Sequence, residues 1–308
     1  MKTIRTTLGA LLAGATLLVS GAVIADSAPT NTLGGRSQVY KNLDPLSLEN
    51  PTSPAAIREV GNANIAPTEI WSRLEKAEKV ECLDCIPIVS KLIFNSNART
   101  REISAWWLRR RILGVFGPGQ VYEQTLKTVA DQSASENKRS YAVEALGEFL
   151  AAPGIPVIAQ AAVSDPSAKV RKSAAYALWR INSQGPNGEL AAAIGDKDEN
   201  VRLQALFGAT RVNVFTGTDA VVKRISDQSP LVRKRAAEAL GTLRTKDAVV
   251  GLIALTSPST ESDANVRAAA VSSLGKIADA AAKQAVKAAE SDPNQFVRDA
   301  AAIALRRL

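Results

Sequence analysis

The chain has 308 residues, of which 46% are hydrophobic and 22% charged, and this balance excludes a disordered chain and a protein with several membrane spans. It contains no histidine, which excludes Ser-His-Asp and Cys-His triads and the common histidine-ligated zinc and iron sites. Two cysteines are too few for a disulfide-rich scaffold or a four-thiolate metal site. We therefore expect no catalytic residue, no metal and no cofactor.

Residues 1–25 have the pattern of a secretory signal peptide. Lys2 and Arg5 are followed by an uncharged apolar stretch that ends in Val23-Ile24-Ala25. We expect cleavage there, so that a periplasmic or secreted protein without a stable membrane span begins at Asp26. The alternative is an uncleaved N-terminal anchor. Cleavage leaves 36 basic and 30 acidic residues, a net charge of +6, which either attracts acidic partners or serves solubility.

Residues 26–66 differ in composition from the rest of the chain. Prolines recur between asparagines and serines, and the apolar residues follow no regular period. The segment is predicted to be an irregular linker or arm with at most a short helix around residues 55–60. The remaining residues, 67–308, are predicted to form one domain.

Cys82 and Cys85 precede an apolar helix predicted at residues 88–94. A local structural disulfide is the expected state, because an exported protein meets an oxidising compartment. Two alternatives are a redox pair, since a thiol at a helix N-terminus has a lowered pKa, and a metal pair that takes further ligands from another chain. No strand-helix-strand unit of a thioredoxin-like fold is predicted nearby.

From about residue 82 onwards the sequence repeats itself with a period close to 31 residues. Each copy carries an arginine, followed by apolar or small residues spaced as on one face of a helix three turns long. A shorter apolar helix precedes each copy, and a turn with Asp and often Pro separates the two helices. The recurring arginines are Arg101, Arg139, Arg171, Arg202, Arg233, Arg267 and Arg298.

The repeated pattern Asp-Pro-x-x-x-Val-Arg-x-x-Ala-Ala-x-Ala-Leu-Gly is similar to the HEAT repeat, in its short form the phycobilisome-lyase HEAT-like repeat. This resemblance covers residues 82–308 and implies an all-α fold, an α-solenoid of about seven helix pairs. Di-iron hydroxylases with such repeats need His-Glu ligands, which this chain lacks. Phycobilin lyases handle a cytoplasmic chromophore, which does not fit a signal peptide.

An acidic residue stands six positions before the arginine in the last five copies. The expected role is a structural ladder, in which each acid caps the second helix and pairs with an arginine of its own or the next repeat. The alternative is a row of arginines that binds anions. The pairs are Asp165/Arg171, Asp196/Arg202, Asp227/Arg233, Glu261/Arg267 and Asp292/Arg298.

Aromatic and arginine side chains recur on one ridge of the second helices, which line the concave side of HEAT-like stacks. Such residues dominate protein interfaces, and we expect this ridge to bind an extended, acidic segment of a partner protein. The alternative is that the rings pack on neighbouring repeats and the arginines form a solvated face. The predicted surface consists of Trp106, Arg110, Tyr176, Trp179, Arg180, Phe207 and Arg211.

The two ends of the repeat array differ from its middle. Trp107 occupies a position where the other copies have Ala, Gly or Ser, so the first repeat is expected to be a cap covered by a helix at residues 68–80. In the last repeat, Ala300 and Ile303 are expected to be exposed and to favour a homodimer.

These patterns predict an exported scaffold that binds an envelope protein on its concave face. One alternative is a thiol redox protein that uses Cys82 and Cys85. Another is a HEAT-like protein that binds nucleic acid or another anionic ligand, which the basic charge allows and export disfavours.

Overall fold

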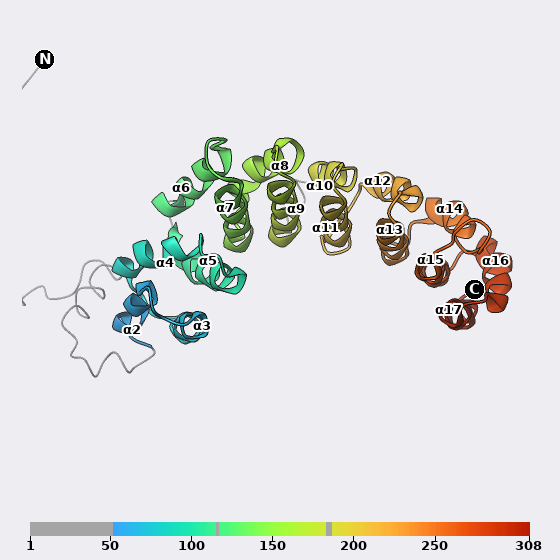
Figure 1. Ribbon diagram of the computed structural model, residues 1–308, viewed down its shortest axis with the longest axis horizontal. Coiled ribbons are helices and arrows are strands. Elements are labelled where there is room, and N and C mark those ends of the chain that lie inside the picture. Colours follow the sequence, from blue (N-terminus) through green and yellow to red (C-terminus); the bar gives the residue numbers. More distant parts are fainter. Residues whose placement is uncertain (1–51, 115–116, 183–186) are drawn as a thin grey trace, which may run out of the picture.

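The computed structural model describes residues 52–114, 117–182 and 187–308. They form an arch of stacked helix pairs, with shorter helices on the outside and longer helices on the inside (Figure 1). The predicted signal peptide, and residues 26–51 of the predicted arm, lie outside the described residues. Among the helices in the described ranges, none is both long and apolar enough to cross a lipid bilayer.

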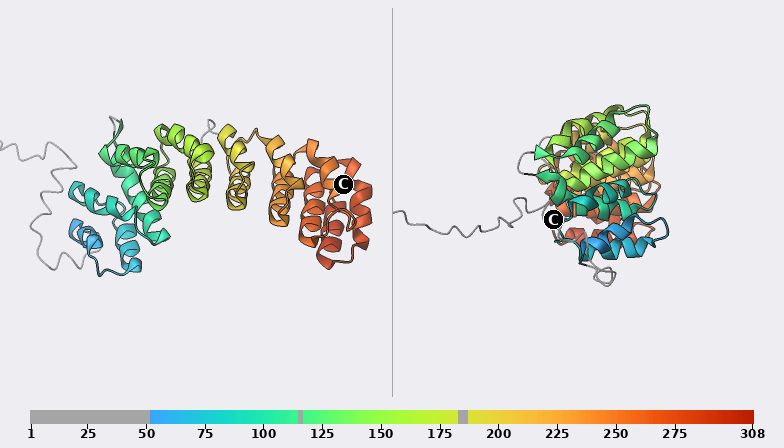
Figure 2. Two further views of the ribbon diagram at one scale, coloured as in Figure 1. Left: turned by 45° about the horizontal axis from the view of Figure 1, so that its top comes forward. Right: turned by 90° about the vertical axis from the view of Figure 1, so that its left-hand side faces the viewer.

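Within these ranges seven helix pairs follow one another along the arch, which confirms the predicted α-solenoid. The outer helices are α4 (Ile86–Leu92), α6 (Gln120–Ala130), α8 (Ile155–Ser164), α10 (Asn187–Ile194), α12 (Thr218–Val222), α14 (Val249–Ala254) and α16 (Lys283–Ala288). The inner helices are α5 (Ala98–Ile112), α7 (Glu136–Phe149), α9 (Ala168–Ile181), α11 (Glu199–Ala209), α13 (Pro230–Thr242), α15 (Ala264–Ile277) and α17 (Gln295–Leu305). The inner helices stand side by side and line the concave face (Figure 2).

Short 3-10 turns begin or end several of the outer helices. They are η3 (Leu83–Cys85), η4 (Ala152–Gly154), η5 (Lys223–Ser226), η6 (Lys246–Ala248), η7 (Ala280–Ala282) and η8 (Ala289–Ser291). A small antiparallel ribbon, β1 (Leu113–Gly114) with β2 (Gly117–Pro118), links the first pair to the second.

Small residues set the distance between neighbouring inner helices. Gly275 of α15 faces Ala304 of α17 so closely that a Cβ on the glycine would lie 2.7 Å from the Cα of Ala304. Gly147 of α7 meets Ala177 of α9 in the same way. One continuous apolar core therefore runs between the two layers along the whole arch.

The short helix that the sequence allowed around residues 55–60 is present, and residues 54–61 pack into the folded domain instead of forming an irregular arm. They form α2 (Pro54–Arg58) and η2 (Glu59–Gly61), and the side chains of Ile57 and Val60 are buried in the core. Ser53 caps α2 by accepting a hydrogen bond from the N–H of Ala56 at 3.1 Å, and proline occupies the first turn. The segment is too short for its sequence to show that this helix packs against the core.

Trp107 of α5 is fully buried, and the C-terminal end of α3 (Pro67–Lys76) covers it. Its indole Nε1 donates a hydrogen bond of 3.1 Å to the carbonyl of Ala77, and the Arg111 guanidinium lies 3.7 Å from its ring centre. Arg111 also donates to the carbonyls of Glu78 and Val80, and burial lowers the pKa of Arg111 to about 10. The large ring fits because the helix before it ends at this point.

Candidate functional site

The recurring arginines connect each repeat to the one that follows it. Arg171 illustrates the arrangement: its Nε and Nη2 donate to both carboxylate oxygens of Asp196, at 2.6 and 2.9 Å, and its Nη1 donates to the carbonyl of Asp165 at 2.9 Å. The ion pairs of this ladder are Arg139–Asp165, Arg171–Asp196, Arg202–Asp227, Arg233–Glu261 and Arg267–Asp292.

The ladder prediction is wrong in two respects: each acid pairs with the arginine of the preceding repeat rather than of its own or the next one, and the acids do not cap the inner helices. The carboxylate of Asp196 accepts the N–H of Asp198, two residues later, and Asp198 is the residue that caps α11. The acid holds the turn before the helix, because its side chain must also reach the preceding arginine. Arg298, in the last copy, donates to the carbonyls of Asp292 and Pro293 at 2.6 and 2.9 Å.

The ladder arginines are poorly placed to bind an external anion. Arg171, Arg202 and Arg267 are each 4% exposed, and their guanidinium groups already face carboxylates. The positive charges of these arginines are paired with buried carboxylates, so they are not available to an external ligand.

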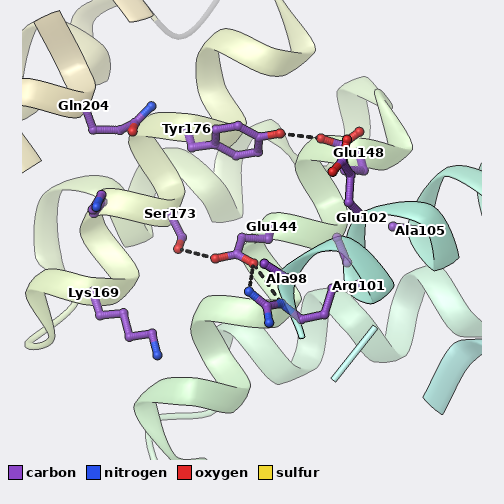
Figure 3. Close-up of a pocket in the computed structure, with 12 residues that line it drawn as sticks. Ala98, Arg101, Glu102, Ala105, Glu144, Glu148, Lys169, Ser173, Tyr176 and Gln204 are labelled. Carbon is purple, nitrogen blue, oxygen red and sulfur yellow. Dashed lines mark hydrogen bonds and ion pairs between the residues drawn. The ribbon is translucent and has the colours of Figure 1, made fainter. Parts of the chain in front are cut away.

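A pocket of about 340 Å³ opens on the concave face between α5, α7 and α9 (Figure 3). On one side, Arg101 donates from Nε and Nη2 to Glu144 at 3.0 and 2.9 Å, and Ser173 donates to the other oxygen of Glu144 at 3.1 Å. Ala98, Ala105 and Ala145 also line the pocket. Three cations and three carboxylates line it in all: Arg101, Lys169, Lys172, Glu102, Glu144 and Glu148.

Tyr176 forms part of this pocket and is fixed by Glu148. Its hydroxyl donates to Glu148 at 2.5 Å, and Arg180 donates to both oxygens of the same carboxylate at 3.0 Å each. Burial, together with the hydrogen bond to Glu148, raises the pKa of Tyr176. The charge of Arg180 is paired with Glu148, so this arginine holds the carboxylate in place and is not a free cation of the pocket.

Three aromatic rings continue from the pocket towards α11. Trp179 packs edge-on against Tyr176 and against Phe207, with ring centres 5.4 and 5.6 Å apart, and the Arg211 guanidinium lies 3.4 Å from the centre of the Phe207 ring. Gly208 makes room for the indole, since a Cβ there would lie 3.0 Å from Trp179. We call Tyr176, Trp179, Phe207 and Arg211 the aromatic cluster.

The structure thus brings five of the seven residues of the predicted surface together and places the other two elsewhere. Arg110 faces Glu78, just after α3, with its Nη1 3.5 Å from the carboxylate, and Trp106 packs half-buried against the core. Sequence reasoning missed Glu144 and Glu148 as site residues. They occupy the same ridge positions in α7 as Tyr176 and Arg180 do in α9, and that register was the available signal.

A second groove, of about 610 Å³, runs along the concave face from α11 to α17. Arg211, Lys234, Arg235 and Lys276 line it, and Glu238 is the one carboxylate among its lining residues. Phe207 and Phe296 also line the groove, and the Phe296 side chain is 73% exposed. This groove is more basic than the pocket over α5–α9.

The sulfur atoms of Cys82 and Cys85 lie within bonding distance of each other at the start of the first helix pair, with Cα atoms 5.3 Å apart, and both residues are buried. A thiol that exchanges with other proteins has to be accessible. Their burial favours the structural interpretation over the redox one. That the pair is oxidised in the native protein stays a prediction.

A family model described as HEAT repeats matches residues 189–261 and 218–306. Among proteins with curated descriptions, none matches the chain at a significant level. The solved structure of the Escherichia coli protein YibA is 17% identical, with a TM-score of 0.54 over 90% of this chain and 98% of that one.

Yeast importin-β, Kap95p, is 14% identical, with a TM-score of 0.56 over 89% of this chain and 41% of that one. Kap95p in a complex with RanGDP gives the same identity and TM-score over 88% and 40%. At these identities the likeness to solved structures shows the fold. The sequence repeats, the two-layered arch and the family match agree: the chain folds as an α-solenoid, and its residues 189–306 match HEAT repeats.

Proposed function

We propose that this protein is an exported, non-enzymatic scaffold whose concave face binds an extended, acidic segment of an envelope protein. The observation that carries the proposal is the aromatic cluster, which places three rings and a stacked arginine on the inner face of the arch. Aromatic and arginine side chains supply large contact area at low entropic cost and dominate binding energy in protein interfaces.

The cluster is held in place before any partner binds. Glu148 fixes Tyr176, Gly208 seats Trp179, and Arg211 stacks on Phe207. A pre-organised surface loses less conformational entropy on binding, which raises affinity. Kap95p, a protein with a similar fold, binds RanGDP, and this supports a role in protein binding for the present arch.

Two further contacts belong to the proposal. The segment 26–66 provides a second contact to the partner through the part that precedes α2. The exposed side chain of Ile303, 57% accessible, supports self-association through the last repeat, whereas Ala300, which was expected to be exposed, is half-buried against the core. Sedimentation should then show a concentration-dependent dimer, and a monomer at all concentrations would remove this part of the proposal.

The central test is a pull-down from envelope extract with the mature protein as bait. The variant Tyr176→Ala/Phe207→Ala should lose the proteins that the wild type captures. The matched control is Val163→Ala/Val250→Ala, which trims two exposed side chains on the outer helices α8 and α14. Single Phe207→Ala is included because it leaves the buried Glu148 with both of its partners.

Circular dichroism and urea unfolding of each bait separate a lost surface from a lost fold. If folded Phe207→Ala captures the same proteins as the wild type, the aromatic cluster is not the binding surface. If the control loses them equally, capture reflects general adhesion.

A further inference from the structure

We propose that the acidic segment docks in the groove over α11–α17, where Lys234 and Lys276 bind its carboxylates. This proposal rests on the proposed function and assigns the charged part of the partner to one half of the arch. Lys276 is exposed, and the 3.8 Å pair of Lys234 with Glu238 is long for an ion pair.

Charge distinguishes the two halves of the concave face. In the pocket over α5–α9 the cations and carboxylates are equal in number, and the Glu144 and Glu148 carboxylates are bonded to Arg101 and Arg180. Among the residues that line the α11–α17 groove, four are cations and Glu238 is the one carboxylate. Just outside it, Asp299 and Arg307 lie beside Lys276, and Glu199 and Asp263 lie beside Lys234, so the excess of positive charge is confined to the floor of the groove. Local excess charge of one sign attracts segments of the opposite sign and speeds their association. An acidic segment is therefore favoured over α11–α17.

The groove also offers an apolar contact, because Phe296 of α17 lines it with a largely accessible ring. Ser273 of α15 lines it as well, but its hydroxyl is buried against Gly241 of α13 and lies out of reach of a bound segment.

The dimensions fit a short extended peptide. Neighbouring packed helices are about 8–10 Å apart, so the three intervals from α11 to α17 span about 24–30 Å. An extended chain advances about 3.3 Å per residue, and about eight residues cover that span. Alternate side chains of such a segment face the inner helices.

Glu238 favours a peptide over a nucleic acid as the occupant. It lies among the groove cations, 2.9 Å from Arg235. A nucleic-acid backbone carries a charge at every residue and would bring phosphates against this carboxylate. A peptide can place a neutral residue opposite Glu238 and acidic residues on either side.

The test measures binding of a labelled eleven-residue peptide of alternating glutamate and alanine by fluorescence anisotropy, with the full chain at low salt. Lysine replaces glutamate in the control peptide. The variant Lys234→Gln/Lys276→Gln should bind the acidic peptide about tenfold more weakly, as expected for two lost charge contacts. The matched control, Lys246→Gln/Lys283→Gln, removes the same charge from exposed positions at the starts of the outer-layer segments and should bind like the wild type.

Each of three outcomes would overturn the proposal. The first is that both double variants bind the acidic peptide equally well, and the second is that the lysine peptide binds as tightly as the acidic one. The third is that a 20-nucleotide single-stranded DNA binds more tightly than the acidic peptide through the same lysines. The last outcome assigns the groove to nucleic acid. If Lys234→Gln/Lys276→Gln keeps every protein captured in the pull-down while Phe207→Ala loses them, the scaffold function stands and this docking site does not.

Discussion

Arg267 and Asp292 belong to successive repeats and form a two-point ion pair, with Nε–Oδ2 and Nη2–Oδ1 distances of 2.8 and 3.0 Å. Both side chains are almost completely buried. The same guanidinium donates to the carbonyl of Glu261 in its own repeat at 2.9 Å. One side chain thus fixes a turn within a repeat and the orientation of the next repeat.

Breaking this pair should destabilise the protein strongly. Asp292→Ala leaves a buried guanidinium without its carboxylate, and the free energy of unfolding should fall by about 3–5 kcal/mol. Glu290→Ala removes the partner of Lys287 in an exposed pair and should change it by less than about 1 kcal/mol. Urea unfolding of both variants measures the difference, and similar small losses would show that the ladder does not hold the repeats together.

Low pH should weaken the ion pair between Arg233 and Glu261. The hydrogen bond from Arg233 lowers the pKa of Glu261 below its ordinary 4.5. Because the folded-state pKa is the lower one, the stabilisation is present above pH 4.5 and is lost as the pH falls through the folded-state value. Glu261→Gln should therefore show a flatter decline of the urea midpoint below pH 4.5 than the wild type. Parallel declines in the two proteins would contradict this assignment.

Two helical glycines should respond in opposite directions to the same substitution. Gly275→Ala should destabilise the protein, because the new Cβ would lie 2.6 Å from the Cβ of Ala304 in the neighbouring helix. Gly188→Ala meets no atom within 4 Å and should stabilise it by up to about 1 kcal/mol, as alanine favours helix. Thermal unfolding of the two variants checks the signs, and a stabilised Gly275→Ala variant would mean that α15 and α17 can move apart freely.

Loss of both cysteines should leave function intact. Cys82→Ser/Cys85→Ser opens a very short loop, for which chain entropy predicts a loss of about 2 kcal/mol. Thiol titration of the native protein should find no free sulfhydryl, and the double variant should capture the same proteins in the pull-down. If the double variant folds but fails in a complementation assay, the cysteine pair itself is required for function.

Export predicts a defined N-terminus. Sequencing of the protein recovered outside the cytoplasm should begin at Asp26, because the apolar stretch before it ends in a peptidase site. A chain that still begins at Met1 would show an anchor rather than a cleaved signal.

The repeat period predicted the solenoid because each inner helix carries the same apolar stripe at the same offset from its arginine. The ion pairs were assigned wrongly, because the sequence pattern paired each acid with an arginine of its own or the next repeat, whereas Asp196 pairs with Arg171 of the preceding repeat. Only the packing of adjacent inner helices decides for Arg171.

The same reason limited the prediction of the binding surface. Tyr176 and Phe207 were found from their register, but Trp179 connects them because Gly208 leaves space in the next repeat. Which cations remain without a carboxylate, as Lys276 does in its groove, depends on partners in other helices. That information is not contained in the periodicity of one helix.

Each rung of the arginine ladder joins only two adjacent repeats, so within residues 52–114, 117–182 and 187–308 the ladder does not fix the total length of the arch. Insertion or deletion of one whole repeat, about 31 residues, would alter a single joint and lengthen or shorten the concave face by about one helix spacing of 8–10 Å. The reach of the binding surface can therefore change in discrete steps during evolution or design, while the remaining repeats keep their packing.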